Sequence, residues 1–492
     1  MLTTNNENKF RLENRFIKKH LYQIENDMFD PNAFVLDFIP VRAERYRKYQ
    51  QYTTEHNAID DRVMPESEIV KVFNKIHSSY FNFIVDQGTG YVYGNPISLN
   101  YANSVGEKSK TWIEEFLKKQ NMAIKQNLLG TQQGATGTAF LLVDMDGDLP
   151  TLRCIDSWDA YVIDQQKAAV YFEDGYVKDG FVKYMYLITP DKITTYRSNV
   201  DFDWSTPAFT KQDDGTIDNL IGHVTLAEYK NNDGSFCDFE TVEDLNDAAD
   251  RLMSSVQDEV EQFRWAYMMI YGTLLDKVEA EKILKTQTGI LNITEPDGRA
   301  EFLTKDIPTE FFSFISKMLN DNIYKFSKSI DLNDPAFAGG NESGEARKWK
   351  VMQLELKAKL KENFFKDGYN ATLEALLSYM RTKLSYNDLD IEDITQQFTR
   401  SLPVDTGYIA DTINKLSSFI SKETALSMIP GINPKDEMEK KYAEMKEGQA
   451  ILDQYGPFGN GGVEDGKHVL GTEEGGTPKG NDDEGEPNAK EA

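Results

Sequence analysis

The chain has 492 residues, of which 40% are hydrophobic and 12% aromatic, so it is long and apolar enough to form more than one folded core. Its 54 Lys and Arg residues against 81 Asp and Glu residues give a formal charge of −27, which disfavours tight wrapping of nucleic acid or binding to anionic lipid. Two distant cysteines, Cys154 and Cys237, and the lack of any apolar run near the roughly 20 residues that span a bilayer exclude a disulfide-built or membrane-spanning protein and favour an intracellular product.

Residues 12–97 are predicted to form helices with short breaks. Within them, the run Val41-Arg-Ala-Glu-Arg-Tyr-Arg-Lys-Tyr alternates basic and aromatic side chains. This alternation can serve nucleic acid, but the flank of an amphipathic helix is its commoner meaning.

Residues 137–229 change to short β-prone runs separated by Asp-Gly pairs, which favour hairpin turns. These runs are 139–143, 160–163, 168–172, 180–188 and 223–229. A β region between helical ones predicts the α+β class. The acidic run 144–148, which has the carboxylates of a calcium loop, lies between β-prone runs and lacks the loop's glycine and final glutamate, so a hairpin turn is favoured.

The second half of the chain is dominated by long helical patterns. Apolar residues recur every three or four positions from Phe239 to Tyr271, which predicts one helix of roughly 50 Å. A small mixed insert follows over 274–306, with strand-like runs at 289–293 and 300–303. Further helices are expected over 309–330 and, with a bend at Gly368, over 345–383.

A glycine-rich segment between the last two of these helices, residues 334–344, has no periodicity. A plain linker is one interpretation, and a mobile loop that touches a moving partner is the other. Arg347, Lys348 and Lys350 follow at the start of a helix, where cations oppose the helix dipole, which indicates a negative partner nearby. Ser421 is expected to cap a short helix, and the acidic tail beyond residue 450 is expected to be disordered.

No catalytic pattern is present in the sequence. The five histidines are scattered without metal-ligand spacing, Gly106-Glu-Lys-Ser lacks the upstream glycine of a phosphate loop, and no nucleophile elbow occurs. We therefore expect no enzyme activity, no cofactor and no metal, and a structural or binding role.

Several ordered stretches of the chain resemble the portal proteins of tailed bacteriophages, in particular those of long-tailed phages of Gram-positive bacteria. They are Arg45-Tyr, His56-Asn-Ala-Ile, 82–97, Gly137-Thr-Ala-Phe, Asn231-Asn-Asp-Gly, 238–242, 302–307, 343–350, 354–357, Phe398, Arg400, Pro403 and 420–430. The resemblance implies a ring, dodecameric in the virion, with wing, stem, clip and crown around an axial channel.

The resemblance divides the chain into expected parts. They are an N-terminal helical segment and α+β wing (1–238), a first stem helix (239–273), a clip (274–306), a second stem helix (307–333), a tunnel loop (334–346), a long wing helix (347–384), a helical crown (385–450) and a disordered acidic tail (451–492).

Candidate site residues follow from the same resemblance. In the tunnel loop they are Phe337, Gly339, Gly340, Asn341, Glu342, Ser343 and Gly344; the basic residues near the channel are Arg347, Lys348 and Lys350; the docking surface of the clip is Lys277, Lys282, Lys285, Asp297 and Arg299. The implied partners are other copies of the chain, double-stranded DNA bound without sequence specificity, the terminase large subunit, the major capsid protein and scaffold, and a head-tail adaptor, with no membrane.

The expected location is the portal vertex of the virion, after synthesis in the host cytoplasm. A helical scaffold protein without a channel is the alternative that explains the acidity and long helices but not the ordered signatures. A nucleotide-dependent enzyme is a weaker alternative, because the phosphate-loop pattern is incomplete.

Overall fold

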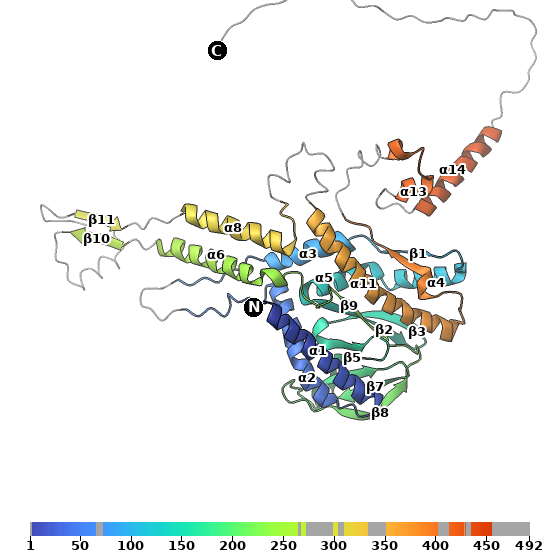
Figure 1. Cartoon of the computed structure of the whole chain (residues 1–492), viewed down its shortest axis with the longest axis horizontal. Helices are drawn as coiled ribbons and strands as arrows, with labels where there is room; N and C mark the ends of the chain where they lie inside the picture. Colours follow the sequence, from blue (N-terminus) through green and yellow to red (C-terminus); the bar gives the residue numbers. More distant parts are fainter. Residues whose placement is uncertain are drawn as a thin grey trace, which may run out of the picture. The chain divides into compact units, whose positions relative to one another are not determined.

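The computed structural model describes most of the chain (Figure 1). The described residues are 2–64, 72–263, 267–271, 299–303, 309–332, 351–401, 413–427, 429 and 434–454. The chain folds into two compact units, Met1–Asp405 and Thr406–Ala492, which we describe separately.

Helices make up the N-terminal part of the first unit, as expected from the sequence. They are α1 (Leu2–Glu25), α2 (Pro31–Thr53), α3 (Tyr80–Tyr93), α4 (Glu107–Lys119) and α5 (Met122–Thr136). The start of α2 is fixed by Asp30, whose carboxylate accepts hydrogen bonds from the backbone N–H groups of Asn32 and Ala33, with Pro31 at the first helical position.

Two antiparallel sheets follow. A three-stranded sheet has the order β3-β2-β9, and a five-stranded sheet has the order β4-β5-β6-β7-β8. Their strands are β2 (Thr138–Asp146), β3 (Leu149–Ile155), β4 (Ala160–Asp164), β5 (Ala168–Val177), β6 (Gly180–Ile188), β7 (Lys192–Arg197), β8 (Thr210–Asp218) and β9 (Leu226–Lys230). The five β-prone runs all contain strand, and β3, β7 and β8 were not predicted.

The acidic run 144–148 forms the end of β2 and the hairpin turn that leads to β3, as predicted. Asp146 pairs with Leu149 across the turn, and Gly147 has a φ of +62°, a conformation that glycine adopts without strain. In the described part of the chain, no three His, Cys, Asp or Glu side chains are grouped closely enough to hold a metal ion.

Helices cover both sheets. Phe34 and Phe38 of α2 pack on Phe172 of β5, and helix α11 (Met352–Tyr379) packs on β9. Helix α11 runs through Gly368, where a Cβ atom would lie 2.6 Å from the carbonyl oxygen of Glu228. The glycine expected to bend the helix therefore allows it to approach the sheet closely.

The prediction of one helix from Phe239 to Tyr271 was wrong. A 3-10 turn (Glu240–Val242) leads into α6 (Glu243–Phe263), and the next described residues form β10 (Tyr267–Tyr271), paired with β11 (Arg299–Leu303). The sequence Tyr-Met-Met-Ile-Tyr is apolar throughout, so it continues the helical spacing equally well, and pairing with β11 decides its conformation. The strand-like run 300–303 is confirmed, and 289–293 lies outside the described residues.

The expected second helix is confirmed as α8 (Thr309–Ser327). It packs against α6 through an apolar core to which Leu319, Ile323 and Ala249 belong. The third helix, α11, continues into a π-helical turn, Met380–Leu384, while residues 345–350 of its predicted start lie outside the described residues.

The part expected as a crown from residue 385 does not separate there. Strand β12 (Ile394–Gln397) pairs with β1 (Ser98–Tyr101), so the chain stays in the first unit until Asp405. The second unit contains α13 (Lys422–Ser427) and α14 (Pro434–Gln454). Ser421 caps α13 as predicted, because its hydroxyl accepts a 3.2 Å hydrogen bond from the Thr424 N–H.

None of the described helices is both long and apolar enough to cross a membrane. The acidic tail expected to be disordered begins with the last turn of α14 and otherwise lies outside the described residues.

Candidate functional site

Most of the candidate site residues lie outside the described residues. These are all residues of the predicted tunnel loop and its basic followers (Phe337, Gly339, Gly340, Asn341, Glu342, Ser343, Gly344, Arg347, Lys348 and Lys350) and four residues of the predicted clip (Lys277, Lys282, Lys285 and Asp297). Arg299 is described as the first residue of β11, opposite Tyr271. The structure therefore bears on these sites through the elements that hold them.

The two ends of the segment 333–350 are anchored to each other and to α3. The Gln87 side chain of α3 forms two 2.8 Å hydrogen bonds with the chain after α8. Its oxygen accepts from the Ile330 N–H, and its nitrogen donates to the Ile330 carbonyl. On the other side of the segment, the Lys357 ammonium of α11 donates to the Ser327 carbonyl at the end of α8, at 3.1 Å. The predicted loop thus starts and ends at fixed points.

Asp238, just before α6, forms a buried ion pair with α11. Its side chain is 1% exposed, and its carboxylate accepts a 2.6 Å hydrogen bond from the ammonium of Lys361, which is 3% exposed. The Lys357 ammonium lies 3.5 Å away, and the Asn231 side chain donates a 3.0 Å bond. Lys357 therefore contacts both Asp238, just before α6, and the end of α8.

The charges around Asp238 compensate for its burial. Burial alone would raise the pKa of the Asp238 carboxyl, but the positive charges of Lys357 and Lys361 outweigh it and hold that pKa below its usual value of 3.8. Burial lowers the pKa of Lys357 despite the attraction of Asp238. A pair so deeply buried costs desolvation free energy, and it stabilises the fold only while both partners are present.

Glycine makes room for this ion pair. The Asp238 N–H donates to the Gly134 carbonyl of α5 at 2.7 Å, and a Cβ atom on Gly134 would lie 2.9 Å from the Asp238 carboxylate. Helix α5 can approach the carboxylate only because this position has no side chain.

A second ion pair joins the end of the first unit to α11. Arg400 donates to Glu355 at 3.0 Å and to Glu362 at 2.8 Å, and the Tyr91 hydroxyl of α3 donates to Glu355 at 2.6 Å. Burial opposes the charged form of Arg400, but both carboxylates favour it and raise the pKa of its guanidinium. The chain that leads to the second unit is thereby fixed to the helix that follows the predicted loop.

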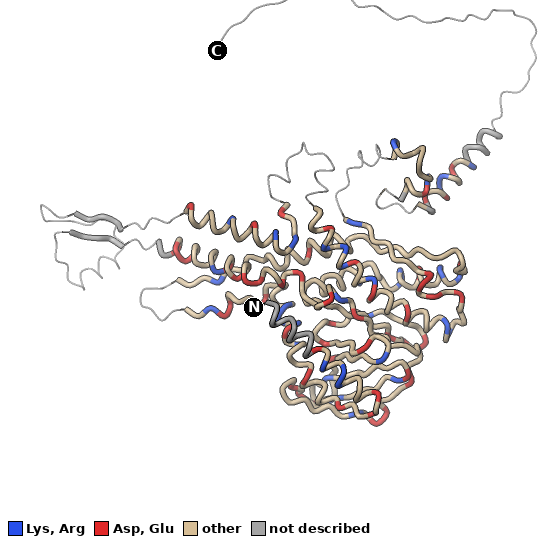
Figure 2. Tube along the Cα trace, in the orientation of Figure 1, with Lys and Arg blue, Asp and Glu red and all other residues tan. Residues whose placement is uncertain are grey.

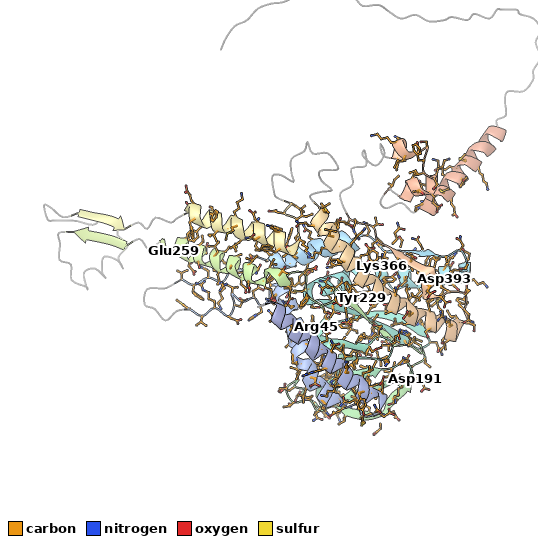
Figure 3. The ribbon with its side chains drawn as sticks, viewed as in Figure 1. Arg45, Asp191, Tyr229, Glu259, Lys366 and Asp393 are labelled. Carbon is orange, nitrogen blue, oxygen red and sulfur yellow. The ribbon has the colours of Figure 1, made fainter. Side chains whose placement is uncertain are left out.

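The basic residues of α2 are internal anchors. Arg45, labelled in Figure 3, is 8% exposed and donates 2.9 Å hydrogen bonds to the carbonyls of Ser157 and Ala160. Lys48 is 3% exposed and pairs with Glu240 at 3.0 Å. Neither side chain is available for a phosphate backbone, which confirms the helix-flank interpretation of residues 41–49 over nucleic-acid binding for these two positions.

An extended segment, residues 72–79, lies along α6, and we call it the strap. Its backbone N–H groups at Asn74, Ile76 and Ser78 donate to side-chain oxygens of α6. The acceptors are Asp258 at 2.7 Å, Ser254 at 2.9 Å and Asp250 at 2.7 Å, respectively. Two residues of extended chain advance roughly 6.6 Å and four residues of helix about 6 Å, so every second amide meets every fourth helix residue.

A family model described as "Phage portal protein, SPP1 Gp6-like" matches residues 38–451, most of the chain. The chain belongs to this portal protein family. The match includes the Asp238 ion pair, the strap, and every predicted loop and clip position, and it confirms the resemblance drawn from the sequence.

Two curated relatives are portal proteins. That of Clostridium phage phiCD119 is 26% identical over 253 residues, which cover 49% of this chain and 53% of the relative. That of Bacillus phage SPP1 is 24% identical over 244 residues, 48% of each protein. The chain spans about half the length of the curated relatives it matches.

Two solved structures are distantly similar in fold to this member of the portal protein family. One is titled "Neck of empty GTA particle computed with C6 symmetry", with a TM-score of 0.39, and another "Virion of native gene transfer agent (GTA) particle", with a TM-score of 0.37. Each is 11% identical and covers 71% of this chain and 88% of the other.

Sequence reasoning gave no role to Asp238, Lys357 or Lys361, which are the centre of the described site. One signal was present: the two lysines are four residues apart and so share one face of α11, a helix with many buried apolar residues. Their partner lies 123 residues from Lys361, and no local pattern indicates it.

Proposed function

We propose that this chain is the subunit of a ring at one vertex of a phage capsid, through which double-stranded DNA is packaged and ejected. The observation that carries the proposal is membership of the portal protein family over residues 38–451. Both curated relatives are named portal proteins. The chain then acts as a structural component of the virion, dodecameric there, and not as an enzyme.

Each part of the chain has a place in this proposal. Residues 1–238 form the N-terminal helices and the wing, and α6 and α8 are the two stem helices. Because α6 ends at Phe263, the hairpin β10–β11 belongs to the clip. Residues 334–346 form the tunnel loop, 347–384 the long helix behind it, and 385–450 the crown, of which 385–405 belong to the first compact unit.

The tunnel loop is proposed to touch DNA without reading its sequence. The net charge of −27 gives the protein little affinity for phosphate, so DNA slides past, while Arg347, Lys348 and Lys350 supply weak local contacts. The bonds from Gln87 to Ile330 and from Lys357 to Ser327 support fixed positions for the chain on either side of the proposed loop.

Docking partners are assigned by part. The clip, with Arg299 on β11 and with Lys277, Lys282, Lys285 and Asp297 in the sequence that connects β10 to β11, would bind the terminase large subunit during packaging and then the head-tail adaptor. The wing would contact the major capsid protein and the scaffold.

Negative-stain electron microscopy of the purified chain tests the ring. We expect closed rings of about a dozen copies around a central hole, the cyclic symmetry of such assemblies. Monomers or dimers at every concentration would contradict the proposal and favour the helical scaffold, and ATP hydrolysis by the chain alone would favour an enzyme.

Alanine at Gly339, Gly340 and Asn341 together tests the tunnel loop. We expect normal rings but reduced packaging and retention of DNA in an assembly assay. The control is Gly90→Ala, at a helical position where a Cβ atom meets nothing within 4 Å. Unchanged packaging and retention in the triple variant would contradict the role of the loop.

A further inference from the structure

The two stem helices and the strap form three layers. One side of α6 packs on α8 through Ala249 and Leu252, and the opposite side receives the strap at Asp250, Ser254 and Asp258 (Figure 1). This stack has two outer faces, one on α8 and one beside the strap.

The outer face of α8 is apolar with a cation at one end. Phe311, Phe314 and Met318 are 59%, 65% and 40% exposed, and their spacing of three and four residues places them in one stripe. Lys325, seven residues beyond Met318, lies on the same side of the helix. Its ammonium forms no ion pair with any residue in the described ranges.

The face beside the strap has apolar residues at one end. Val63 and Met64 are 83% and 43% exposed. They follow Arg62, whose guanidinium covers the Phe73 ring of the strap at 4.5 Å and lies 3.9 Å from Asp258 near the end of α6. These two side chains leave apolar surface for a partner at this end of the face.

The other end of this face is an acidic cleft of about 470 Å³ between the end of α2 and the start of α6, where Figure 2 shows acidic residues. Asp61, Asp244 and Asp247 line it, together with Gln51 and Asn57. Arg47 lines it too, but its guanidinium already pairs with Glu44 at 2.8 Å and lies 3.6 Å from Glu243. Gln51 and Asn57 are 5% and 1% exposed, and Gln51 Oε1, Asn57 Oδ1, Asn57 Nδ2 and Asp247 Oδ1 are buried without a hydrogen-bond partner among the described residues. Three oxygen acceptors and one amide donor on the residues that line this cleft are thus unpaired.

The chemistry of the cleft fits an ammonium group. Burial raises the pKa of Asp247, and the charges of Asp250 and Glu243 raise it further, so a cation here relieves both desolvation and repulsion. A lysine ammonium offers three N–H donors to the carboxylates that line the cleft. A bare metal ion fits less well, since no three acidic side chains of the described chain are close enough to bind it.

The apolar and the charged parts of the two outer faces lie at corresponding positions along the helix axes. Helices α6 and α8 are antiparallel, joined through the β10–β11 hairpin (Figure 1). The Thr241 hydroxyl, just before α6, donates to the Phe326 carbonyl at 3.2 Å, which sets Lys325 level with the cleft. The start of α8, with Phe311 and Phe314, is then level with the end of α6 and the apolar residues beside Arg62.

We propose that the acidic cleft of one copy binds Lys325 of the next copy in the ring, while Val63 and Met64 contact that copy's Phe311 and Phe314. In a ring, each subunit presents one face to one neighbour and the opposite face to the other, so complementary opposite faces are the required arrangement. This inference rests on the proposed function, and it names the surfaces by which the copies assemble.

Charge reversal tests the pairing. Asp247→Lys and Lys325→Asp should each shift ring assembly, followed by mass photometry, to at least about tenfold higher protein concentration, and the double variant should restore it. Lys325 is exposed, so its substitution leaves the subunit folded, and circular dichroism checks the Asp247 variant. Asp214→Lys, on the exposed edge strand β8, is the control and should assemble normally. A double variant that stays unassembled would overturn the pairing.

Cross-linking tests the geometry independently. In the variant Asp244→Cys with Lys325→Cys, a short bismaleimide should give a ladder of covalent oligomers on a denaturing gel. The native thiols interfere little, because Cys237 is buried and burial raises the pKa of Cys154 to about 11. Rings that form without a ladder and tolerate every charge reversal would refute this interface while leaving the portal function intact, whereas a wild-type chain without rings would refute the function itself.

Discussion

Replacing Asp238 by asparagine should lower the free energy of unfolding of the first unit by about 3–5 kcal/mol, the usual cost of breaking a buried ion pair by removing one partner. We expect a larger loss than for a surface ion pair, because the side chains of Asp238 and Lys361 are only 1% and 3% exposed. The substitution leaves two lysine ammonium groups, those of Lys357 and Lys361, without their common counter-ion.

The assay is urea denaturation at pH 7, followed by tryptophan fluorescence at equal protein concentration. Lys361→Met and the double variant complete a thermodynamic cycle, from which we expect a coupling free energy of about 2 kcal/mol. The control is Glu107→Gln, which removes a 2.9 Å ion pair between Glu107 and Lys110. The Glu107 side chain is 87% exposed, so this substitution should cost at most about 1 kcal/mol of the free energy of unfolding. If Asp238→Asn lowers the free energy of unfolding no more than this control does, the buried ion pair does not stabilise the start of α6.

The pH dependence has a defined sign. Since the pKa of Asp238 is lower in the folded chain than its ordinary value of 3.8, the unfolded chain binds more protons near that pH. The stabilisation is therefore complete above pH 3.8 or so and is lost as the pH falls through the lower folded value. The wild type should lose stability on acidification in this window more steeply than Asp238→Asn, and parallel curves from pH 6 to pH 2 would contradict the argument.

Two further results are expected from single substitutions. Gly368→Ala should lower the free energy of unfolding by about 1–3 kcal/mol, because its Cβ atom meets the Glu228 carbonyl oxygen at 2.6 Å. Gly90→Ala, at a helical position with no neighbour within 4 Å, should raise it by up to about 1 kcal/mol. Equal urea midpoints for the two variants would contradict this expectation. Gln87→Ala should speed hydrogen exchange of the Ile330 amide about fivefold, the effect of losing one hydrogen bond worth roughly 1 kcal/mol, and an unchanged rate would show that the anchor is unimportant.

Two of the strands that the sequence predicted have uninterrupted buried runs. Strand β2 has six consecutive buried residues and β5 five, and such runs have few alternatives to a sheet. Strand β8, Thr-Lys-Gln-Asp-Asp-Gly-Thr-Ile-Asp, is almost wholly exposed at the edge of its sheet, so neither hydrophobicity nor alternation marks it. Pairing with β7 makes it a strand, and that information lies elsewhere in the chain.

The family was recognisable from ordered local signatures, but the residues that hold the site together were not. Asp238 and Lys361 look like ordinary surface charges in one dimension, and only the close approach of α5 and α11 makes them a buried pair. The acidic cleft has the same origin, because Gln51 and Asp247 come from helices far apart in sequence.

The strap imposes a rule on the length of α6. Its acceptors at 250, 254 and 258 stay on one line only while four residues separate them. Deleting one residue between Asp250 and Ser254 turns everything beyond it by about 100° relative to the strap. The same deletion also rotates the apolar side of α6 away from α8. Insertions and deletions in this helix should thus be rare in evolution even where single substitutions are common, and changes in the length of α6 should occur beyond Asp258, where no strap residue depends on the phase of the helix.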